Sequence, residues 1–195
     1  FNSIDQIFSF IKKSRQVTFE SPSTEYTFNL LNELYIEKTK KRILDFSITS
    51  GFELNKKITI NNKSYPSLQT FSNQVLKILK NGLMNSELNK LTLMHGDLCA
   101  SNIITDNRNE TIKLIDPRGG LDTLFESNNN VSGDFRYDVA KLGHSLIGNY
   151  DYIVTGFFNL KKLDNSLNFE FSLHHKSKKQ LNDFYFSKVK EMNVD

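Results

Sequence analysis

The chain has 195 residues, which is enough for one domain or for one domain with an appendage. Its 25 basic and 22 acidic residues leave a net charge of +3, so composition gives no electrostatic case for nucleic-acid binding. The single cysteine, Cys99, excludes an internal disulfide framework and is typical of a reducing compartment, so we expect a cytoplasmic protein. No apolar run reaches the roughly 18 residues of a membrane span, so we expect no membrane partner.

The first third of the chain shows helical periodicity. Residues 3 to 13 predict a helix capped by Ser3, with one apolar stripe. The stripe consists of Ile4, Ile7, Phe8 and Ile11. A second helix is predicted to begin near Ser21-Pro22 and to end at the basic residues 38 to 42, since basic side chains favour a helix C-terminus.

A hairpin and a third helix are predicted next. Residues 58 to 65 alternate around Asn61-Asn62, which is typical of a tight β-hairpin. Residues 67 to 80 predict a helix that Gly82 could end. Its predicted buried residues are Phe71, Val75 and Leu79. None of these elements carries a group of residues typical of a catalytic or ligand-binding site, so we interpret them as scaffold.

The centre of the chain predicts a strand, a loop and a hairpin. Leu91 to Met94 form a short apolar run, and the residues from Ile103 to Ile115 flank a turn at 106 to 109. Because a hairpin folds its two ends together, we expect Asp97 and Asp116 to lie close in space despite the gap in sequence.

The last third alternates between helix and strand patterns. Residues 121 to 133 predict a polar loop bordering a substrate, and residues 134 to 146 predict a helix. Residues 167 to 173 alternate strictly, as in a strand with one buried face, and a final helix is predicted from Ser177. We therefore expect residues 1–195 to form one mainly helical α+β domain with short β pieces.

The residues that carry chemistry lie in the central loop. Phosphoryl transfer from ATP needs a carboxylate oriented on the attacking hydroxyl and oxygen ligands for Mg²⁺. Asp97 is the candidate for the first role, and Asn102 and Asp116 are candidates for the second. His95 is interpreted as structural, because a loop imidazole can hydrogen-bond the backbone and fix the shape of the loop.

The order His95-Gly96-Asp97, with Asn102 five residues after the aspartate, resembles the catalytic loop of kinases. Glycine after the histidine resembles the aminoglycoside phosphotransferase/choline kinase family, whose members act on small molecules. The segment from Asp116 to Gly119 stands where kinases carry their magnesium-binding segment. The resemblance is strongest over residues 91 to 146.

This resemblance implies a fold and a set of roles. The fold would be the C-lobe of a protein-kinase-like enzyme, mainly helical, with short hairpins carrying the catalytic and metal-binding loops. Asp97 would be the catalytic base, Asn102 and Asp116 the magnesium ligands, and Asp138 the support of the catalytic loop beside His95. The cofactors would be ATP and Mg²⁺.

Arg118 and Cys99 are open to more than one interpretation. Arg118 could contact a phosphate or an acidic substrate, or it could form an ordinary surface salt bridge. Cys99 lies inside the loop but has no pattern of a nucleophile around it, so we interpret it as a small packing residue.

The sequence motifs of a kinase N-lobe, which hold the phosphates of ATP from above, are not recognisable in the sequence. The nine glycines form no G-x-G-x-x-G, and no strand lysine with a helix glutamate is recognisable. We therefore expect residues 1–195 to be a fragment of a longer protein, inactive alone and partnered by an N-lobe of the same protein. The alternative is a non-catalytic kinase-like module that binds a ligand or a partner. A protein kinase is disfavoured by Gly96 and by the lack of an A-P-E segment.

The expected reaction is ATP-dependent phosphorylation of a hydroxyl on a small molecule of aminoalcohol, sugar or aminoglycoside type. A cationic acceptor would need aromatic or acidic walls, which Tyr150, Asp151 and Tyr152 could supply. A sugar would need neutral hydrogen-bonding groups, which the asparagine-rich stretch at 128 to 130 could supply. The sequence leaves both acceptors open.

Overall fold

The structure is a computed structural model, and it describes residues 2–21, 23–84, 89–120, 131–163, 166–172 and 178–192. It has the mixed α+β composition expected from the sequence. Its residue contacts divide the chain into two compact units. The first consists of Phe1–Ser21, Lys90–Phe157 and Leu173–Asp195, and the second of Pro22–Asn89 and Phe158–Ser172.

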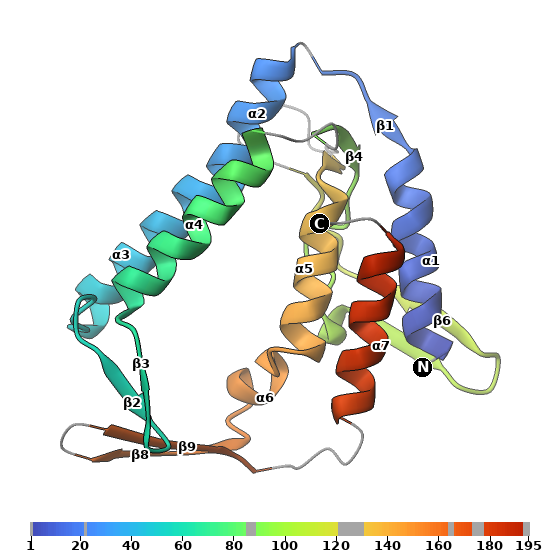
Figure 1. Cartoon of the computed structure of the whole chain (residues 1–195). Helices are drawn as coiled ribbons and strands as arrows, with labels where there is room; N and C mark the ends of the chain where they lie inside the picture. The colour runs from blue at the N-terminus through green and yellow to red at the C-terminus, as the bar shows by residue number, and fades with distance from the viewer. Residues whose placement is uncertain are drawn as a thin grey trace. The chain divides into compact units, whose positions relative to one another are not determined.

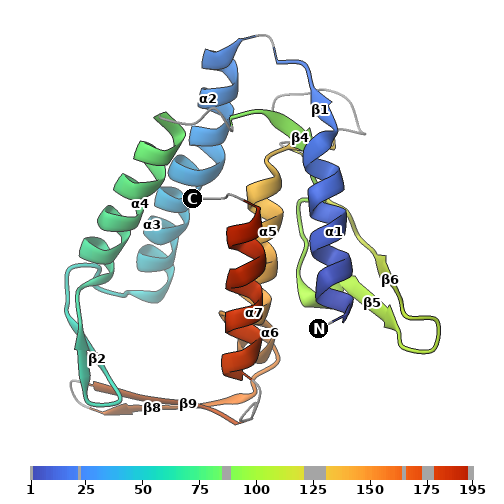
Figure 2. The ribbon, with the colours of Figure 1, turned by 45° about the vertical axis from the view of Figure 1, so that its right-hand side comes forward.

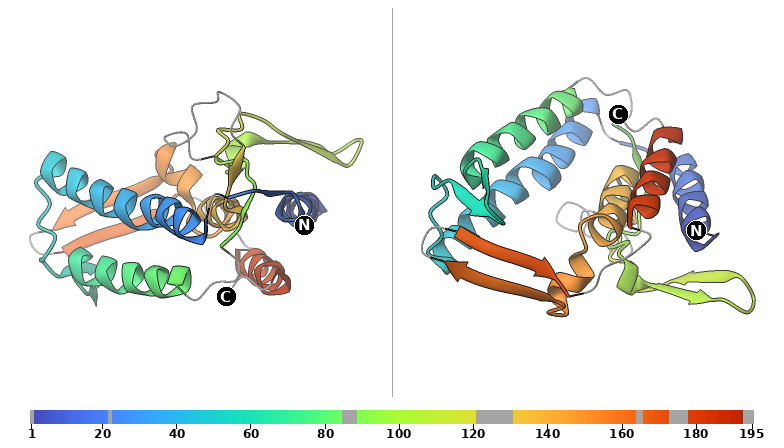
Figure 3. Two further views of the ribbon diagram at one scale, coloured as in Figure 1. Left: turned by 90° about the horizontal axis from the view of Figure 1, so that it is seen from above. Right: turned by 60° about the horizontal axis from the view of Figure 1, so that its bottom comes forward.

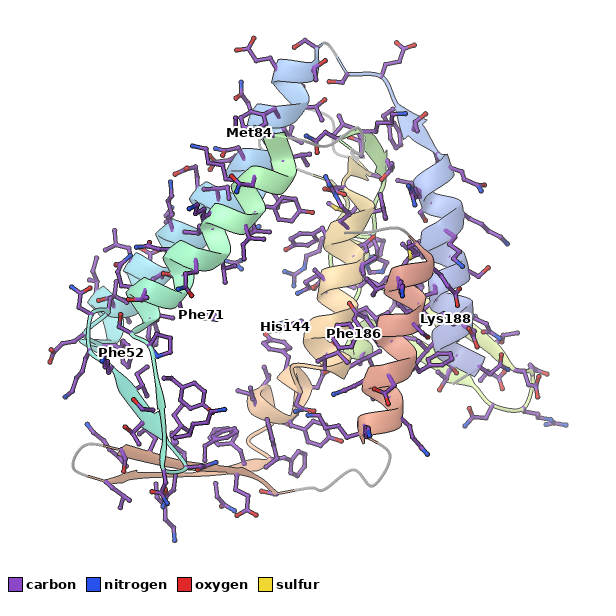
Figure 4. The ribbon with its side chains drawn as sticks, viewed as in Figure 1. Phe52, Phe71, Met84, His144, Phe186 and Lys188 are labelled. Carbon is purple, nitrogen blue, oxygen red and sulfur yellow. The ribbon has the colours of Figure 1, made fainter. Side chains whose placement is uncertain are left out.

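The helices of the first unit pack around one central helix. Its helices are α1 (Asn2–Gln16), α5 (Phe135–Leu146), α6 (Tyr150–Val154) and α7 (Lys178–Glu191). Helices α1 and α7 both lie along α5 (Figure 1). Figure 4 shows Lys188 on α7 at the side of α1, where its ammonium pairs with Asp5 at 2.8 Å. The buried core is formed by Ile7, Phe8, Ile11, Leu98, Phe135, Val139, Leu142, Tyr185 and Met192.

The strands of the first unit form a small sheet and a separate hairpin. Strands β1 (Thr18–Phe19) and β7 (Ser132–Gly133) flank β4 (Leu91–Leu93), and both pair with it antiparallel. Strands β5 (Ile103–Asp106) and β6 (Thr111–Leu114) form the predicted hairpin, which lies beside α1 (Figure 2). A single turn of 3₁₀ helix, η2 (Ala100–Asn102), connects the central loop to β5.

The helices of the second unit form an antiparallel pair. Helix α2 (Thr24–Asn32) continues through the π-helical turn η1 (Glu33–Glu37) into α3 (Lys38–Ser50). Helix α4 (Leu68–Met84) lies beside this long helix, as Figure 3 shows. The side chains of Leu30, Leu31, Leu34 and Ile36 of the long helix are buried. Leu30, Leu31 and Leu34 lie on one side of it, because they are spaced by one, three and four residues.

The sheet of the second unit has the strand order β3-β2-β9-β8. Strands β2 (Ile58–Ile60) and β3 (Lys63–Tyr65) form the hairpin predicted around Asn61-Asn62. Both asparagines have positive φ angles, 50° and 62°, as a two-residue hairpin turn requires. Strand β9 (Ser166–Phe171) pairs parallel with β2 and antiparallel with β8 (Phe158–Leu163).

Two helix caps differ from the predictions. Helix α1 begins at Asn2, so Ser3 lies inside the helix and does not cap it. Helix α2 is capped by Ser23 and not by Ser21, since the Ser23 hydroxyl accepts a hydrogen bond from the Tyr26 amide at 3.0 Å. Serines at both positions fit the same sequence rule, and only the backbone geometry decides between them.

The basic residues 38 to 42 do not lie at a helix end, so that prediction was wrong. They open α3, which runs on to Ser50 and ends at Gly51, whose φ of 67° is the left-handed conformation of a helix C-terminus. Glycine was therefore the stronger stop signal than the basic cluster.

The third predicted helix exists as α4 but differs in detail. The side chain of Phe71 is 55% exposed, and Val75 and Leu79 are half-buried. Gly82 lies inside the helix, which continues to Met84. The predicted loop at 121 to 133 ends in strand β7, while residues 121–130 and Ser177 lie outside the described residues. No helix within the described ranges is long and apolar enough to cross a membrane.

Candidate active site

The central loop, residues 95 to 100, lies between the end of β4 and the helix α5. The Leu98 side chain is completely buried in the core of the first unit and anchors the middle of the loop. Helix α5 is itself fixed at its start, because the Asp134 side chain caps it by accepting a hydrogen bond from the Arg136 amide at 2.9 Å. The loop therefore rests on a helix with a well-defined first turn.

Asp138 holds the beginning of the loop from α5. Its Oδ2 accepts a hydrogen bond from the His95 amide at 2.7 Å, and its Oδ1 accepts one from the Gly96 amide at 2.9 Å. The carboxyl group is buried, and this burial raises the pKa of Asp138 to about 6, although the two backbone hydrogen bonds lower it. One carboxyl group therefore orients two consecutive amides.

Two further residues of α5 hold the rest of the loop. The Lys141 ammonium lies 2.7 Å from Oδ1 of Asp97, and the Ser145 hydroxyl accepts a hydrogen bond from the Ala100 amide at 3.0 Å. Asp138, Lys141 and Ser145 are spaced by three and four residues, so they lie along one face of the helix. We call these three residues the α5 stripe. It contacts the loop at its start, middle and end.

Of the α5 stripe, only Asp138 was predicted from the sequence. Lys141 and Ser145 were missed, although the pattern D-x-x-K-x-x-x-S carried a signal. Polar residues at helical spacing, on a helix whose adjoining positions supply the buried Val139 and Leu142, indicate a second contact surface. The partner of that surface could not be read from the helix alone.

Asp97 carries the carboxylate at the centre of the site. Its side chain is 10% exposed, and Arg118 supplies a second cation, with Nε 3.1 Å from Oδ2. Burial raises the pKa of Asp97, but the hydrogen bond and charge of Lys141 and the charge of Arg118 outweigh it, so the pKa lies below its usual range. The carboxylate is therefore ionised at neutral pH.

His95 shapes the loop through its ring. Its Nδ1 accepts a hydrogen bond from the Asp97 amide at 3.3 Å, which places the proton of the neutral ring on Nε2. Burial lowers the pKa of His95, although the Ile115 carbonyl and the charges of Asp97 and Asp116 oppose it. The buried Nε2 makes no hydrogen bond of standard geometry with the described residues. A neutral, buried imidazole is suited to holding a loop and not to exchanging protons.

Asn102 lies at the base of the hairpin, directly beside the strand that leads to Asp116. Ile103 pairs with Leu114, and the Ile115 amide donates to the Asn102 carbonyl at 3.0 Å. The side-chain Nδ2 of Asn102 donates to the Asp97 carbonyl at 2.9 Å, and within the described residues its Oδ1 makes no hydrogen bond. The hairpin thus places the backbone of Asn102 beside Ile115, the residue that precedes Asp116.

The segment after the hairpin, residues 115 to 119, is held to the loop through its backbone. The amides of Arg118 and Gly119 both donate to the His95 carbonyl, at 2.9 and 3.0 Å. Gly96 has a φ of 82°, and a Cβ at this position would collide with the Gly119 carbonyl oxygen. The close approach of the two segments therefore requires glycine at position 96.

Asp116 is strained and exposed. Its φ of 54° is the left-handed region, which is uncommon for a residue with a side chain. Its side chain is exposed, and within the described ranges it makes no hydrogen bond or ion pair. Strain of this kind clusters at ligand sites, so an unpaired carboxylate held in this conformation is a candidate ligand-binding group.

Asn102 and Asp116 together offer one amide oxygen and one carboxylate for a cation. Among the described residues, no group of three or more His, Cys, Asp or Glu side chains is arranged to hold a metal ion. Mg²⁺ in phosphate sites is held by one or two protein ligands together with water and phosphate oxygens. The two oxygens therefore fit a magnesium–nucleotide complex better than a site built by the protein alone.

A cavity of about 600 Å³ lies in the same unit. It begins at Ala100 and Ser101 of η2 and extends over the C-terminal end of α5 and over α6. Ser145 of the α5 stripe lines it, one helical turn from Lys141. Asp151, Tyr152 and Lys178 also line it, so its walls include an acidic, an aromatic and a basic side chain.

The first residue of α6, Tyr150, packs its ring against the ring of His144 on α5. His144, labelled in Figure 4 on α5, lies with its ring centroid 4.2 Å from that of Tyr150. Burial lowers the pKa of His144, and the charge of Lys141 lowers it further.

Cys99 is buried, with Sγ 3.2 Å from the Ser101 hydroxyl, which agrees with its interpretation as a packing residue.

Comparison with known proteins adds no assignment: no protein-family model matches the chain, and neither a curated protein nor a solved structure shows significant similarity to it.

Proposed function

We propose that this chain is the catalytic-loop lobe of an ATP-dependent phosphotransferase of the aminoglycoside phosphotransferase/choline kinase type. The observation that carries the proposal is the arrangement around Asp97. A buried, ionised carboxylate is held by a helix, and it lies on a loop that shares backbone hydrogen bonds with the segment bearing Asp116. Phosphoryl transfer requires this combination of an oriented carboxylate and nearby oxygen ligands.

In this proposal Asp97 acts on the acceptor hydroxyl. Its carboxylate accepts the proton of the hydroxyl while the hydroxyl oxygen forms a bond to the γ-phosphorus of ATP. The bond between the γ-phosphorus and the bridging oxygen breaks, and ADP leaves with that electron pair. The low pKa of Asp97 keeps it in the form that can accept the hydrogen bond and orient the hydroxyl.

Asn102 and Asp116 would hold Mg²⁺ through Oδ1 and the carboxylate. When bound, the ion supplies positive charge that neutralises the phosphate oxygens. Nδ2 of Asn102 stays on the Asp97 carbonyl, so the same residue would tie the metal ligands to the catalytic loop. The Asp116 carboxylate is exposed and has no competing hydrogen-bond or ion-pair partner among the described residues.

The 600 Å³ cavity is the candidate acceptor site. It shares Ala100 and Ser101 with the turn between Asp97 and Asn102, and its size suits a small molecule. Asp151 and Tyr152 attract cations, whereas Lys178 in the same lining repels them, so a cationic acceptor and a neutral sugar both stay candidates.

The proposal is tested with the full-length protein, ATP, Mg²⁺ and a panel of aminoalcohols, aminoglycosides and neutral sugars. We expect acceptor-dependent release of ADP that stops when EDTA removes Mg²⁺. Asp116→Ala should raise the Mg²⁺ concentration needed for half-maximal rate by at least tenfold. Asp106→Ala, which removes an exposed aspartate of the same hairpin, is the control and should change nothing. ADP release that is independent of every acceptor would contradict the proposal.

A second function is favoured by one observation. Both oxygens of Asp97 are engaged by cations, Lys141 on one and Arg118 on the other, as in a site that binds without turnover. A non-catalytic kinase-like module would bind ATP or a cationic small molecule with calorimetrically measurable heat but release no ADP. Calorimetry and the ADP assay on one preparation separate the two functions.

A further inference from the structure

Two cations share the Asp97 carboxylate, but they are held in different ways. Lys141 comes from the middle of α5, its side chain is 24% exposed, and its ammonium lies 2.7 Å from Oδ1. Arg118 comes from the strained segment 115 to 119, its side chain is 69% exposed, and its Nε lies 3.1 Å from Oδ2. The two oxygens of one carboxylate are therefore in unequal environments.

The difference in exposure decides which contact persists. An ion pair between exposed side chains gains little, because water and salt screen it and because two long side chains lose freedom. A partly buried pair is screened less, and here one partner is fixed by its helix. Asp138 and Ser145 hold the loop backbone to α5 on either side of Lys141, so the distance between the ammonium and Asp97 is set by the helix itself.

We propose that Lys141 is the positioning residue of Asp97 and that Arg118 is its exchangeable partner. Lys141 fixes Oδ1 and thereby directs Oδ2 outward. Arg118 covers Oδ2 in the free protein and leaves it when an acceptor hydroxyl takes its place. The released guanidinium then lies two residues from Asp116, where it can pair with a phosphate oxygen. The catalytic part of this inference rests on the proposed function.

The positioning role predicts coupling between Lys141 and Asp97 that does not depend on catalysis. The probe is hydrogen exchange at the Ala100 amide, which bonds to Ser145 next to the contact. Lys141→Met should lower its protection factor at least fivefold, and Arg118→Met should lower it less than twofold. In the Asp97→Asn background, Lys141→Met should have no further effect, because the partner is already gone. Lys188→Met, which breaks the pair with Asp5, is the matched control.

The kinetic arm uses the same variants in the full-length protein. Lys141→Met should lower kcat about 100-fold with the KM for ATP changed less than threefold, because a misplaced carboxylate affects the transition state and not nucleotide binding. The kcat of Lys141→Arg should be at least tenfold higher than the kcat of Lys141→Met. Arg118→Met should lower kcat less than tenfold and raise the KM for ATP, since it removes only a phosphate contact.

The outcomes separate the inference from the proposed function. If the wild-type protein phosphorylates no acceptor, the proposed function fails, and hydrogen exchange alone decides the role of Lys141. The inference is overturned if Lys141→Met lowers Ala100 protection equally with and without the Asp97 carboxylate. It is also overturned if Arg118→Met has the larger effect on protection.

Discussion

The two segments that build the candidate site are stabilised by different means. The loop at residues 95 to 100 is held by side chains of α5, which contact its beginning, middle and end. The segment at residues 115 to 119 is held by its own amides on the His95 carbonyl, and its acidic residue is strained and exposed. One segment is anchored to a buried helix, and the other is anchored to the first segment and, through the Ile115 amide, to the Asn102 carbonyl.

This difference suggests that the two segments have different functions in the site. A group that must orient a reacting atom benefits from a fixed frame, which a buried helix provides. A group that must hold an exchangeable metal–nucleotide complex benefits from an unpaired carboxylate that the ligand itself completes. We therefore expect substitutions beneath the loop to affect stability strongly. Substitutions in the second segment should affect ligand binding more than stability.

The largest effect is expected from Asp138→Ala. Two amides, one of them fully buried, lose their acceptor, at about 1–3 kcal/mol each, while removal of a buried carboxylate offsets part of this loss. The net loss of unfolding free energy at pH 7 should be about 2 kcal/mol, measured by urea denaturation. Asp106→Ala is the matched control, because Asp106 also accepts two backbone amides but is exposed. It should lose less than about 1 kcal/mol.

The pH dependence of the same residue gives a second effect. The folded-state pKa of Asp138 is about 6 and its unfolded value is 3.8, so between these values the folded protein holds a proton that the unfolded chain has lost. Unfolding free energy from this group should therefore fall as pH rises from 4 to 6, by at most about 1.4 kcal/mol per pH unit. Asp138→Ala should abolish this component, so the difference between variant and wild type should be larger at pH 4 than at pH 7. A constant difference would contradict the assignment.

Gly96→Ala tests the contact between the two segments. The substitution forces a left-handed residue with a Cβ against the Gly119 carbonyl, and we expect a loss of about 2 kcal/mol in unfolding free energy. Gly156→Ala is the control, since Gly156 has a similar φ of 75° and open space where the Cβ would be. It should lose about 1 kcal/mol from backbone strain alone. Equal losses would show that the contact with Gly119 is unimportant.

The smallest effect on stability is expected from Asp116→Gly, and it has the opposite sign. Glycine relieves the left-handed strain, so unfolding free energy should rise by about 0.5 kcal/mol. The same change removes a proposed magnesium ligand, so Mg²⁺-dependent turnover of the full-length protein should fall. A destabilised variant would show that Asp116 supports the fold and would remove the contrast between the two segments.

The parts of the site that the sequence predicted are those encoded by local patterns. The hairpin that joins Asn102 to Asp116 follows from two apolar runs around a turn. Helix α5 follows from the apolar periodicity of residues 134 to 146. The helix-ending role of Gly51 was overlooked in favour of nearby basic residues, because two valid stop signals competed and only one is used.

The parts that were missed depend on contacts between distant residues. Ala100 and Ser145 are 45 residues apart, and the sequence around neither of them predicts the hydrogen bond. The ion pair between Asp97 and Lys141 is likewise invisible until the helix lies beneath the loop. The left-handed backbone at Asp116 is likewise predicted by no local rule that was applied to the sequence.

In the proposed function, Asp97 orients the acceptor hydroxyl for phosphoryl transfer. The most direct measurement is the transfer of the γ-phosphoryl group of ATP to the best acceptor by full-length protein carrying Asp97→Asn. Asp5→Asn is the control, because it breaks another aspartate–lysine pair of the same unit. We predict that Asp97→Asn lowers kcat on the order of 100- to 10,000-fold with the KM for ATP nearly unchanged, while Asp5→Asn keeps wild-type kinetics. Wild-type turnover in Asp97→Asn would contradict the account.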